Sequence, residues 1–248
     1  MPFYTDDTEV TELGTLHLEM FDEIDSIQSA RYPDLRQNTV NVKLNAGLPH
    51  RFEIDLDAPY LAISRAADSK SSRGIGDTNF GLKWKIREAT PDSHLPAVAT
   101  SFYIEVPTGD ERQELGSGLT DYALNFMAEE PISEHTRFNS NFGILLAGNT
   151  STGALGTQTT RGQVLTGGLS MIHDVNERLF LGAEVYGAIA DATGLNRSQL
   201  QFLVGGGYNV LSSVTISFAL LGGKYAASPS IGGQIGFAVD APNLLPLH

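Results

Sequence analysis

Residues 74–86, GIGDTNFGLKWKI, contain closely spaced glycines that could bind a phosphate, because glycines before an apolar run can form a phosphate-binding loop. The G-x-G-x-x-G fingerprint needs its third glycine where Asn79 stands, with a strand before the glycines and a helix after them. Here the apolar Phe80 and Leu82 instead alternate with polar residues such as Lys83, which is the period of a β-strand. The stretch therefore predicts a two-faced strand and not a phosphate-binding loop.

Signals for catalysis or metal binding are poor elsewhere in the chain. None of the histidines is spaced as H-x-H or H-E-x-x-H, and no G-x-S-x-G nucleophile motif is present; the histidines are His17, His50, His94, His135, His173 and His248. The absence of cysteine excludes disulfides and cysteine-ligated metals. We therefore expect no catalytic residue, no metal site and no cofactor, and we interpret the protein as not being an enzyme.

Charged side chains that recur on the polar faces of predicted strands are the remaining candidates. Eight acids and four bases share this pattern: Glu19, Glu53, Asp55, Asp57, Glu105, Asp121, Glu129 and Glu184, with Lys43, Lys83, Lys85 and Arg137. If the opposite, apolar faces meet lipid, these side chains line a lumen whose negative field favours cations or neutral solutes. Alternatively, opposite charges pair across neighbouring strands and brace the lumen, with Lys43–Asp55 and Lys83–Glu105 as candidate pairs.

Alternation of apolar and polar residues organises nearly the whole chain. It predicts twelve strands between Leu16 and Val239, although the phase of residues 162–173 is ambiguous. Links after the second, eighth and tenth predicted strands are short, and those after the odd-numbered strands are longer and polar. Two further links, 88–96 and 131–136, are longer than tight hairpins. The pattern indicates an up-and-down antiparallel meander with its long loops at one end.

Composition fits a single turn-rich β domain. The 26 glycines, 18% charged residues and 41% hydrophobic residues are not those of a disordered chain, and 248 residues can form one undivided barrel. No apolar run is long enough for a transmembrane helix, but membrane strands would not show one. The net charge of −13 and the lack of a basic cluster exclude a nucleic-acid partner. We expect an N-terminal periplasmic segment at 1–12, one barrel at 13–239 and a tail at 240–248.

Strand number and length decide which face the apolar residues present, because a sandwich and a membrane barrel alternate in the same way. About eight strands close a barrel that side chains can fill, so twelve strands around an apolar interior would leave a hole. The predicted strands, of roughly 10 to 13 residues, match the tilted length that crosses a bilayer. Aromatic residues that could form interface belts are Phe3, Tyr60, Phe102, Tyr122, Phe138, Phe180, Tyr208 and Phe237.

Two stretches of the chain carry a family-specific pattern. The pattern is a G-x-G-D strand opening, a strand that ends in P-T-G, and an L-G-x-G-x-x-D-[YF] re-entry, found here as Gly74, Gly76 and Asp77; Pro107, Thr108 and Gly109; and Leu115, Gly116, Gly118, Asp121 and Tyr122. The opening PFYTDD also matches a P-F-x-T-D-D start. Together these residues resemble the bacterial outer-membrane transporter family associated with the phenol meta-cleavage pathway. Asp77 and Asp121, beside glycines at strand ends, are expected to brace loop turns, with a ligand or cation site as the alternative.

The resemblance implies a twelve-stranded outer-membrane barrel made with a signal peptide, which MPFYTDDTEV does not contain. We expect passive passage of small solutes, aromatic or hydrophobic ones among them, through a polar and net-acidic lumen. The expected partners are outer-membrane lipid and these solutes, and the oligomeric state is left open. One alternative is a plugged barrel that acts through its extracellular loops, and another is a soluble β-barrel that binds a ligand in an apolar cavity.

Overall fold

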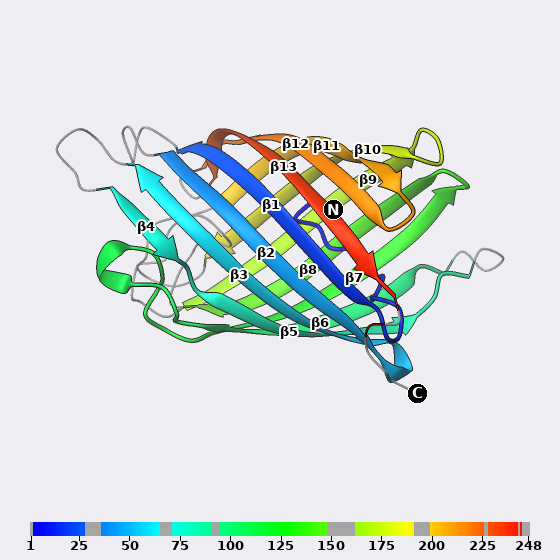
Figure 1. Cartoon of the computed structure of the whole chain (residues 1–248), viewed down its shortest axis with the longest axis horizontal. Coiled ribbons are helices and arrows are strands. Elements are labelled where there is room, and N and C mark those ends of the chain that lie inside the picture. Colours follow the sequence, from blue (N-terminus) through cyan, green and yellow to red (C-terminus); the bar gives the residue numbers. More distant parts are fainter. Residues whose placement is uncertain are drawn as a thin grey trace.

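The chain forms a closed antiparallel β-barrel in a computed structural model that describes residues 2–27, 36–64, 71–90, 95–147, 162–190, 199–225, 228–242 and 244 (Figure 1). The described residues include thirteen strands: β1 Leu16–Ile27, β2 Arg36–Leu48, β3 Phe52–Ser64, β4 Ser72–Ile75, β5 Thr78–Arg87, β6 Ala97–Val106, β7 Asp121–Ser133, β8 Thr136–Ala147, β9 Gly162–Asp174, β10 Leu179–Ala190, β11 Gln199–Leu211, β12 Val214–Gly223 and β13 Pro229–Ala241. Two short 3-10 helices, η1 Pro49–Arg51 and η3 Glu111–Gln113, lie between strands.

Pairing between neighbours closes the sheet into a ring. β1 pairs with β2 on one side and with β13 on the other, so the first and last strands form the seam of the barrel. β4 and β5 both pair with β3 and are separated only by Gly76 and Asp77, so together they make one interrupted wall strand. Counted this way the wall has twelve strands, which confirms the predicted all-β, up-and-down barrel.

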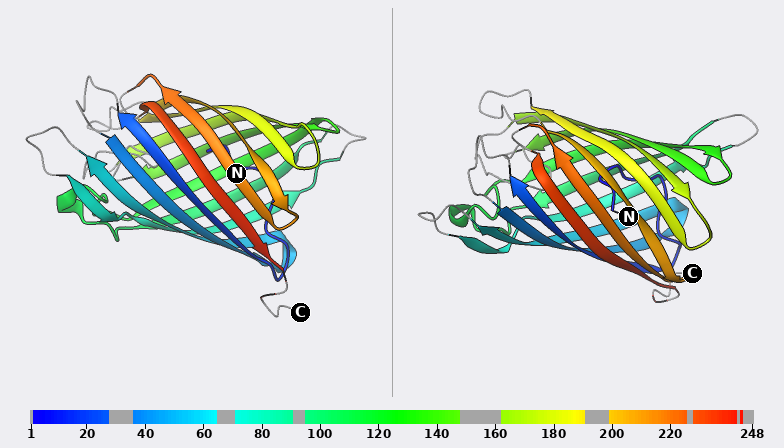
Figure 2. Two further views of the ribbon diagram at one scale, coloured as in Figure 1. Left: turned by 45° about the horizontal axis from the view of Figure 1, so that its top comes forward. Right: turned by 90° about the horizontal axis from the view of Figure 1, so that it is seen from above.

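The two ends of the barrel differ in the length of their connections. The tight connection between β2 and β3 contains η1, and its residues His50 and Arg51 adopt positive φ angles of 62° and 66°. The turns after β7, β9 and β11 lie at the same end, whereas the link from β6 to β7, with η3, lies at the other (Figure 1). The last strand, β13, ends at the short-turn end (Figures 1 and 2). This arrangement agrees with the predicted alternation of short turns and long loops.

Burial shows that the barrel is apolar outside and charged inside. On β5, Phe80 and Trp84 are 51% and 41% exposed, whereas Lys83 and Lys85 are only 3% and 4% exposed. The same alternation of exposed apolar and buried polar residues recurs around the wall, as on β1, where Met20 is exposed and Glu19 buried. A soluble protein hides such a continuous apolar surface, and a membrane barrel presents it to lipid. The alternative of a soluble barrel with an apolar cavity is therefore wrong.

The structure resolves the phase of the ambiguous segment 162–173. Leu165, Leu169 and Met171 of β9 are exposed on the outer wall, and Val164 and Ile172 are buried inside. Two of the proposed belt aromatics are wrong, because Phe180 is buried and Phe3 packs against buried residues inside the barrel. No helix among the described residues is long and apolar enough to span a membrane.

Arginine in place of Leu220 should destabilise the barrel by about 2–4 kcal/mol, the cost of a cation on the lipid face near the bilayer midplane. Leu220 is 66% exposed on the outer face, in the middle part of β12. The matched control is Leu211→Arg, 62% exposed at the end of β11 beside a short turn, which should cost only about 0–1 kcal/mol. Urea titration of the protein in lipid vesicles measures both free energies of unfolding. Equal, small effects at the two sites would contradict a lipid-facing wall.

Candidate functional site

The interior of the barrel is acidic along β1 to β3. Glu19, Glu23 and Asp25 of β1, with Glu53 and Asp55 of β3, are all buried on the inner face of the wall. Among the residues predicted to line a lumen, Glu19, Glu53, Asp55, Lys83, Lys85, Asp121 and Glu184 are buried, and Lys43, Asp57, Glu105, Glu129 and Arg137 are half-buried. Glu23 and Asp25 are not among the predicted lumen-lining residues, although they continue the alternation that begins at Glu19.

One part of the inner wall carries apolar side chains. Leu203 of β11 and Ala219 and Leu221 of β12 form a buried cluster on the inner face, and Val164 and Ile172 of β9 are also buried. This apolar wall is close to the carboxylates of β1, because only β13 lies between β12 and β1.

The N-terminal segment, residues 2–12, lies inside the barrel and crosses it from β10 to β3. Figures 1 and 2 show the N-terminus within the ring of strands from each direction. Phe3 and Tyr4 pack against the apolar cluster, and Thr11 donates from its backbone N–H and its hydroxyl to Glu53 across the interior, both at 2.5 Å. The predicted periplasmic location of residues 1–12 does not hold for the described residues of this segment, which occupy the interior.

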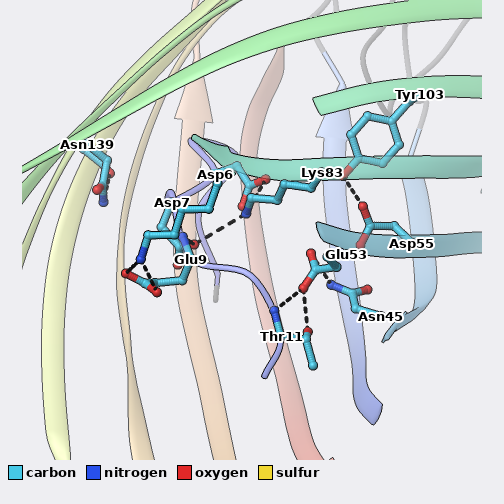
Figure 3. Close-up of polar contacts among 12 residues, drawn as sticks. Asp6, Asp7, Glu9, Thr11, Asn45, Glu53, Asp55, Lys83, Tyr103 and Asn139 are labelled. Carbon is cyan, nitrogen blue, oxygen red and sulfur yellow. Dashed lines mark hydrogen bonds and ion pairs between the residues drawn. The ribbon is translucent and has the colours of Figure 1, made fainter. Parts of the chain in front are cut away.

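Two buried lysines hold the acidic part of the N-terminal segment. The Lys83 ammonium lies 3.2 Å from a carboxylate oxygen of Asp6 and 3.6 Å from one of Asp7. The Lys85 ammonium donates to both carboxylate oxygens of Glu9 at 2.8 Å. Figure 3 shows these acids converging on β5 beside the Thr11–Glu53 contact. A buried ammonium is costly unless it is paired. The segment supplies the partners of Lys83, and it shares Lys85 with Glu88, whose carboxylate lies 2.5 Å from the Lys85 ammonium.

The aromatic end of the N-terminal segment is held by carboxylates from two walls. The Tyr4 hydroxyl donates to the Glu23 carboxylate, with oxygen–oxygen distances of 2.5 and 2.7 Å. The backbone N–H groups of Tyr4 and Thr5 donate to Glu184 at 3.2 and 2.5 Å. Phe3 lies against Gly182, where an added Cβ would come 2.6 Å from the Phe3 ring. A side chain at position 182 would therefore displace the Phe3 ring.

The N-terminal segment leaves the interior beside β2. Leu13 bridges to Gly47, and the Gly47 N–H donates to the carbonyl of Thr15 at 3.2 Å. A Cβ at Gly47 would collide with the carbonyl oxygens of Thr11 and Glu12, so this crossing requires glycine. The chain then enters β1 at Leu16.

Both predicted lysine pairs are wrong. The register of β2 and β3 sets Lys43 opposite Asp57, and Asp55 faces Asn45 instead. Lys83 lies opposite Ser101 on β6, four residues along each strand from the pair that Glu105 makes with Asn79. Alternation identifies the face of a residue, but the register of neighbouring strands decides which residues meet.

The family-motif residues gather at the long-loop end and form a loop anchor. Asp77, between β4 and β5, accepts the N–H of Gly109 at 3.0 Å and the N–H of Ser117 at 2.7 Å. Thr108 donates from its hydroxyl to the carbonyl of Gly76 at 2.7 Å. The loop after β6 is thereby fastened to the break between β4 and β5, as expected for a carboxylate that braces turns. Gly74, Pro107, Gly116, Gly118, Asp121 and Tyr122 lie in the same loop or at the strand ends that flank it.

Within this loop, Asp110 caps η3. Its carboxylate accepts the N–H of Arg112 at 2.9 Å and the side-chain amide of Gln113 at 2.7 Å. The hydrogen bond from Gln113 stabilises the ionised carboxylate and lowers the pKa of Asp110 below its usual value. Among the described residues, no group of three or more His, Asp or Glu side chains is arranged to hold a metal ion.

Comparisons with known proteins agree with this geometry. The model of the family described as "Putative MetA-pathway of phenol degradation" matches residues 33–239. The fold is similar to that of an outer membrane channel from Pseudomonas putida F1, with a TM-score of 0.71, 13% identity, and coverage of 95% of this chain and 98% of that one. KdgM porin and NanC porin give TM-scores of 0.56 and 0.57 at 8% and 9% identity, each covering 90% of this chain and 98% of the porin. No curated protein matches the chain significantly.

Replacing Lys83 by methionine should loosen the N-terminal segment, because Asp6 and Asp7 lose their buried partner. The chain has no cysteine, so Thr8→Cys gives a single label site at a residue that is 0% exposed. We expect Lys83→Met to speed labelling of that cysteine by a water-soluble maleimide about tenfold, or about 1.4 kcal/mol. This is less than breaking a fully buried pair costs, since Asp6 is 47% exposed and partly screened by solvent.

The control for Lys83→Met is Lys224→Met, which removes an exposed lysine after β12 and should leave the labelling rate unchanged. Unchanged labelling in Lys83→Met as well would show that the ion pairs do not hold the segment.

Replacing Asp77 by alanine should release the loop after β6. Hydrogen bonds to a charged acceptor contribute about 1.5–3 kcal/mol each, and Asp77 accepts two from this loop. We expect trypsin to cleave after the exposed Arg112 at least about tenfold faster in Asp77→Ala than in the wild type. Asp110→Ala, which removes only the cap of η3 within the loop, should have a much smaller effect. Equal cleavage rates in the two variants would contradict the anchoring role of Asp77.

Proposed function

The chain belongs to the family described as "Putative MetA-pathway of phenol degradation", and we propose that it is a passive outer-membrane channel for small solutes, narrowed by its own N-terminal segment. The observation that supports this proposal is the crossing of residues 2–12 through a charged interior, tied to β5 at Lys83 and to β3 at Glu53. The channel needs no cofactor and no energy coupling, because solutes move down their own gradients.

Charge is the first basis of selection in this proposal. The lumen is lined by the acids and bases identified in the sequence, together with Glu23 and Asp25, which adds two carboxylates to an interior already rich in them. Lys83 and Lys85 contribute little positive field, since Asp6, Asp7 and Glu9 neutralise them. A net negative field admits cations and neutral solutes in preference to anions.

The apolar wall is the second basis of selection. Leu203, Ala219 and Leu221 form a surface that favours the apolar part of an uncharged solute, while the buried carboxylates of the other strands keep the rest of the lumen wet. Small aromatic or hydrophobic solutes with one polar group suit such a mixed lining. The family description and the similarity to outer membrane channels support this choice of solute and of transport.

The N-terminal segment also favours a second candidate, a barrel that is closed at rest. Its contacts with Glu184 of β10 and Glu53 of β3 bridge opposite parts of the ring, which is the arrangement of a plug. In that case the long-loop end, which faces the cell exterior in either proposal, carries the function through its loops. Conductance separates the two candidates.

Planar-bilayer recording tests the proposal with the wild type and a variant that lacks residues 2–12. We expect small channels in the wild type, larger channels in the deletion variant, and reversal potentials that report cation preference. Glu19→Gln should weaken that preference, because it removes a carboxylate from the inner face of β1, whereas Glu134→Gln, at an exposed turn, should leave it unchanged. Anion preference, or the absence of conductance from both wild type and deletion variant, would refute the channel.

A further inference from the structure

Tyr4 is a phenol that the chain itself holds inside the barrel. Its hydroxyl donates to the Glu23 carboxylate, and the two oxygen–oxygen distances, 2.5 and 2.7 Å, place the hydroxyl close to both carboxylate oxygens. The centroid of its ring lies 5.7 Å from that of the Tyr186 ring, at an interplanar angle of 30°. The other side of the contact is the buried aliphatic cluster of Leu203, Ala219 and Leu221. One acceptor, one aromatic ring and one aliphatic cluster thus contact a single hydroxylated ring.

Glu23 is built to receive a hydroxyl donor. It is 5% exposed on the inner face of β1, and its second neighbour, Gln234 of β13, donates a side-chain amide hydrogen at 3.1 Å. Asp25, 1% exposed, lies beside Glu23 on the same face. A neutral hydroxyl can satisfy a carboxylate in this setting, whereas an anionic ligand would add a negative charge next to two buried acids. The chemistry of the pocket therefore selects a neutral donor.

Tyr4 belongs to the N-terminal segment, which is not one of the strands of the barrel wall. Eleven residues separate Tyr4 from β1, and they are held by side-chain contacts with Glu184, Lys83, Lys85 and Glu53 and by a single isolated bridge from Leu13 to Gly47. A group on such a tether acts as an intramolecular ligand with an effective concentration on the order of millimolar. A free molecule of the same shape and polarity competes with it at comparable concentrations.

We propose that the pocket formed by Glu23, Tyr186 and the Leu203–Ala219–Leu221 cluster is a binding site for small neutral phenols, which Tyr4 occupies as a tethered ligand. Entry of a phenol exchanges the Tyr4 hydroxyl for the solute hydroxyl on Glu23 and moves the N-terminal segment away from the apolar wall. The relevance of this exchange to transport rests on the proposed channel function, but binding at the pocket does not.

The hydroxyl is the group on which discrimination depends. Toluene and anisole have rings that fit beside Tyr186 and the aliphatic cluster, but neither can donate a hydrogen bond to Glu23. A site that hydrogen-bonds a hydroxyl rejects the analogue without it, because the buried acceptor is then left unpaired. We expect phenol to bind at least about tenfold more tightly than anisole.

Calorimetry with the detergent-solubilised protein tests the pocket in the absence of any membrane or transport. Tyr4→Ala empties the pocket and should bind phenol, whereas Tyr4→Phe keeps the ring in place and should bind it no better than the wild type. Adding Glu23→Gln to Tyr4→Ala should reduce the difference between phenol and anisole to about threefold or less. Unfolded Tyr4→Ala is recognised by loss of the heat-dependent shift in gel mobility.

A second measurement keeps the test informative if Tyr4→Ala does not fold. In a protein whose only change is Thr8→Cys, millimolar phenol should speed maleimide labelling as it displaces the N-terminal segment, and anisole should not. The proposal is overturned if folded Tyr4→Ala binds phenol and anisole equally or binds neither, or if the two solutes affect labelling alike. A channel that fails to conduct would leave these binding results intact, and failed binding would leave the conductance results intact.

Discussion

The structure depends on one constraint, that backbone N–H and C=O groups facing lipid must be satisfied within the protein. A sheet meets this constraint only by closing on itself, and here the closing contact is the pairing of β1 with β13, from Leu16–Ala241 to Ile27–Pro229. Once the ring is closed, the period of two along each strand fixes the rest. Apolar residues such as Ile24 and Leu220 must face outward, and the polar residues between them must face inward.

The second consequence is electrostatic. The interior of a barrel this size cannot be filled by apolar packing alone. The wall contributes buried lysines as well as carboxylates to it. Lys83 pairs with Asp6 and Lys85 with Glu9 of the N-terminal segment, and Lys85 also pairs with Glu88 just after β5. Glu53 and Glu184 accept N–H groups from the segment. The segment therefore satisfies wall charges of both signs, and its own backbone is satisfied by the wall in return.

Much of this architecture could be predicted from the sequence, and the limits are physical. Strict alternation from Phe80 to Lys85 was enough to orient β5, because the face of a strand residue depends only on local spacing. The partners of Lys83 were not predictable, because they lie some 76 residues away in a stretch without periodicity, which was interpreted as periplasmic. Asp77 was predicted as a turn brace from its neighbouring glycines, but nothing local indicated that it would bind the backbone of Gly109 and Ser117.

The enclosed position of the N-terminal segment has a consequence for how the barrel is assembled. The seam joins strands from opposite ends of the chain, so it is the contact of highest sequence separation and the slowest to form by loop closure. A segment that is continuous with β1 must either lie inside before β1 pairs with β13, or enter end-first through an opening of the closed ring. If the segment enters before the seam closes, a newly assembled barrel contains it from the start. If the seam closes first, the barrel is empty until the segment enters.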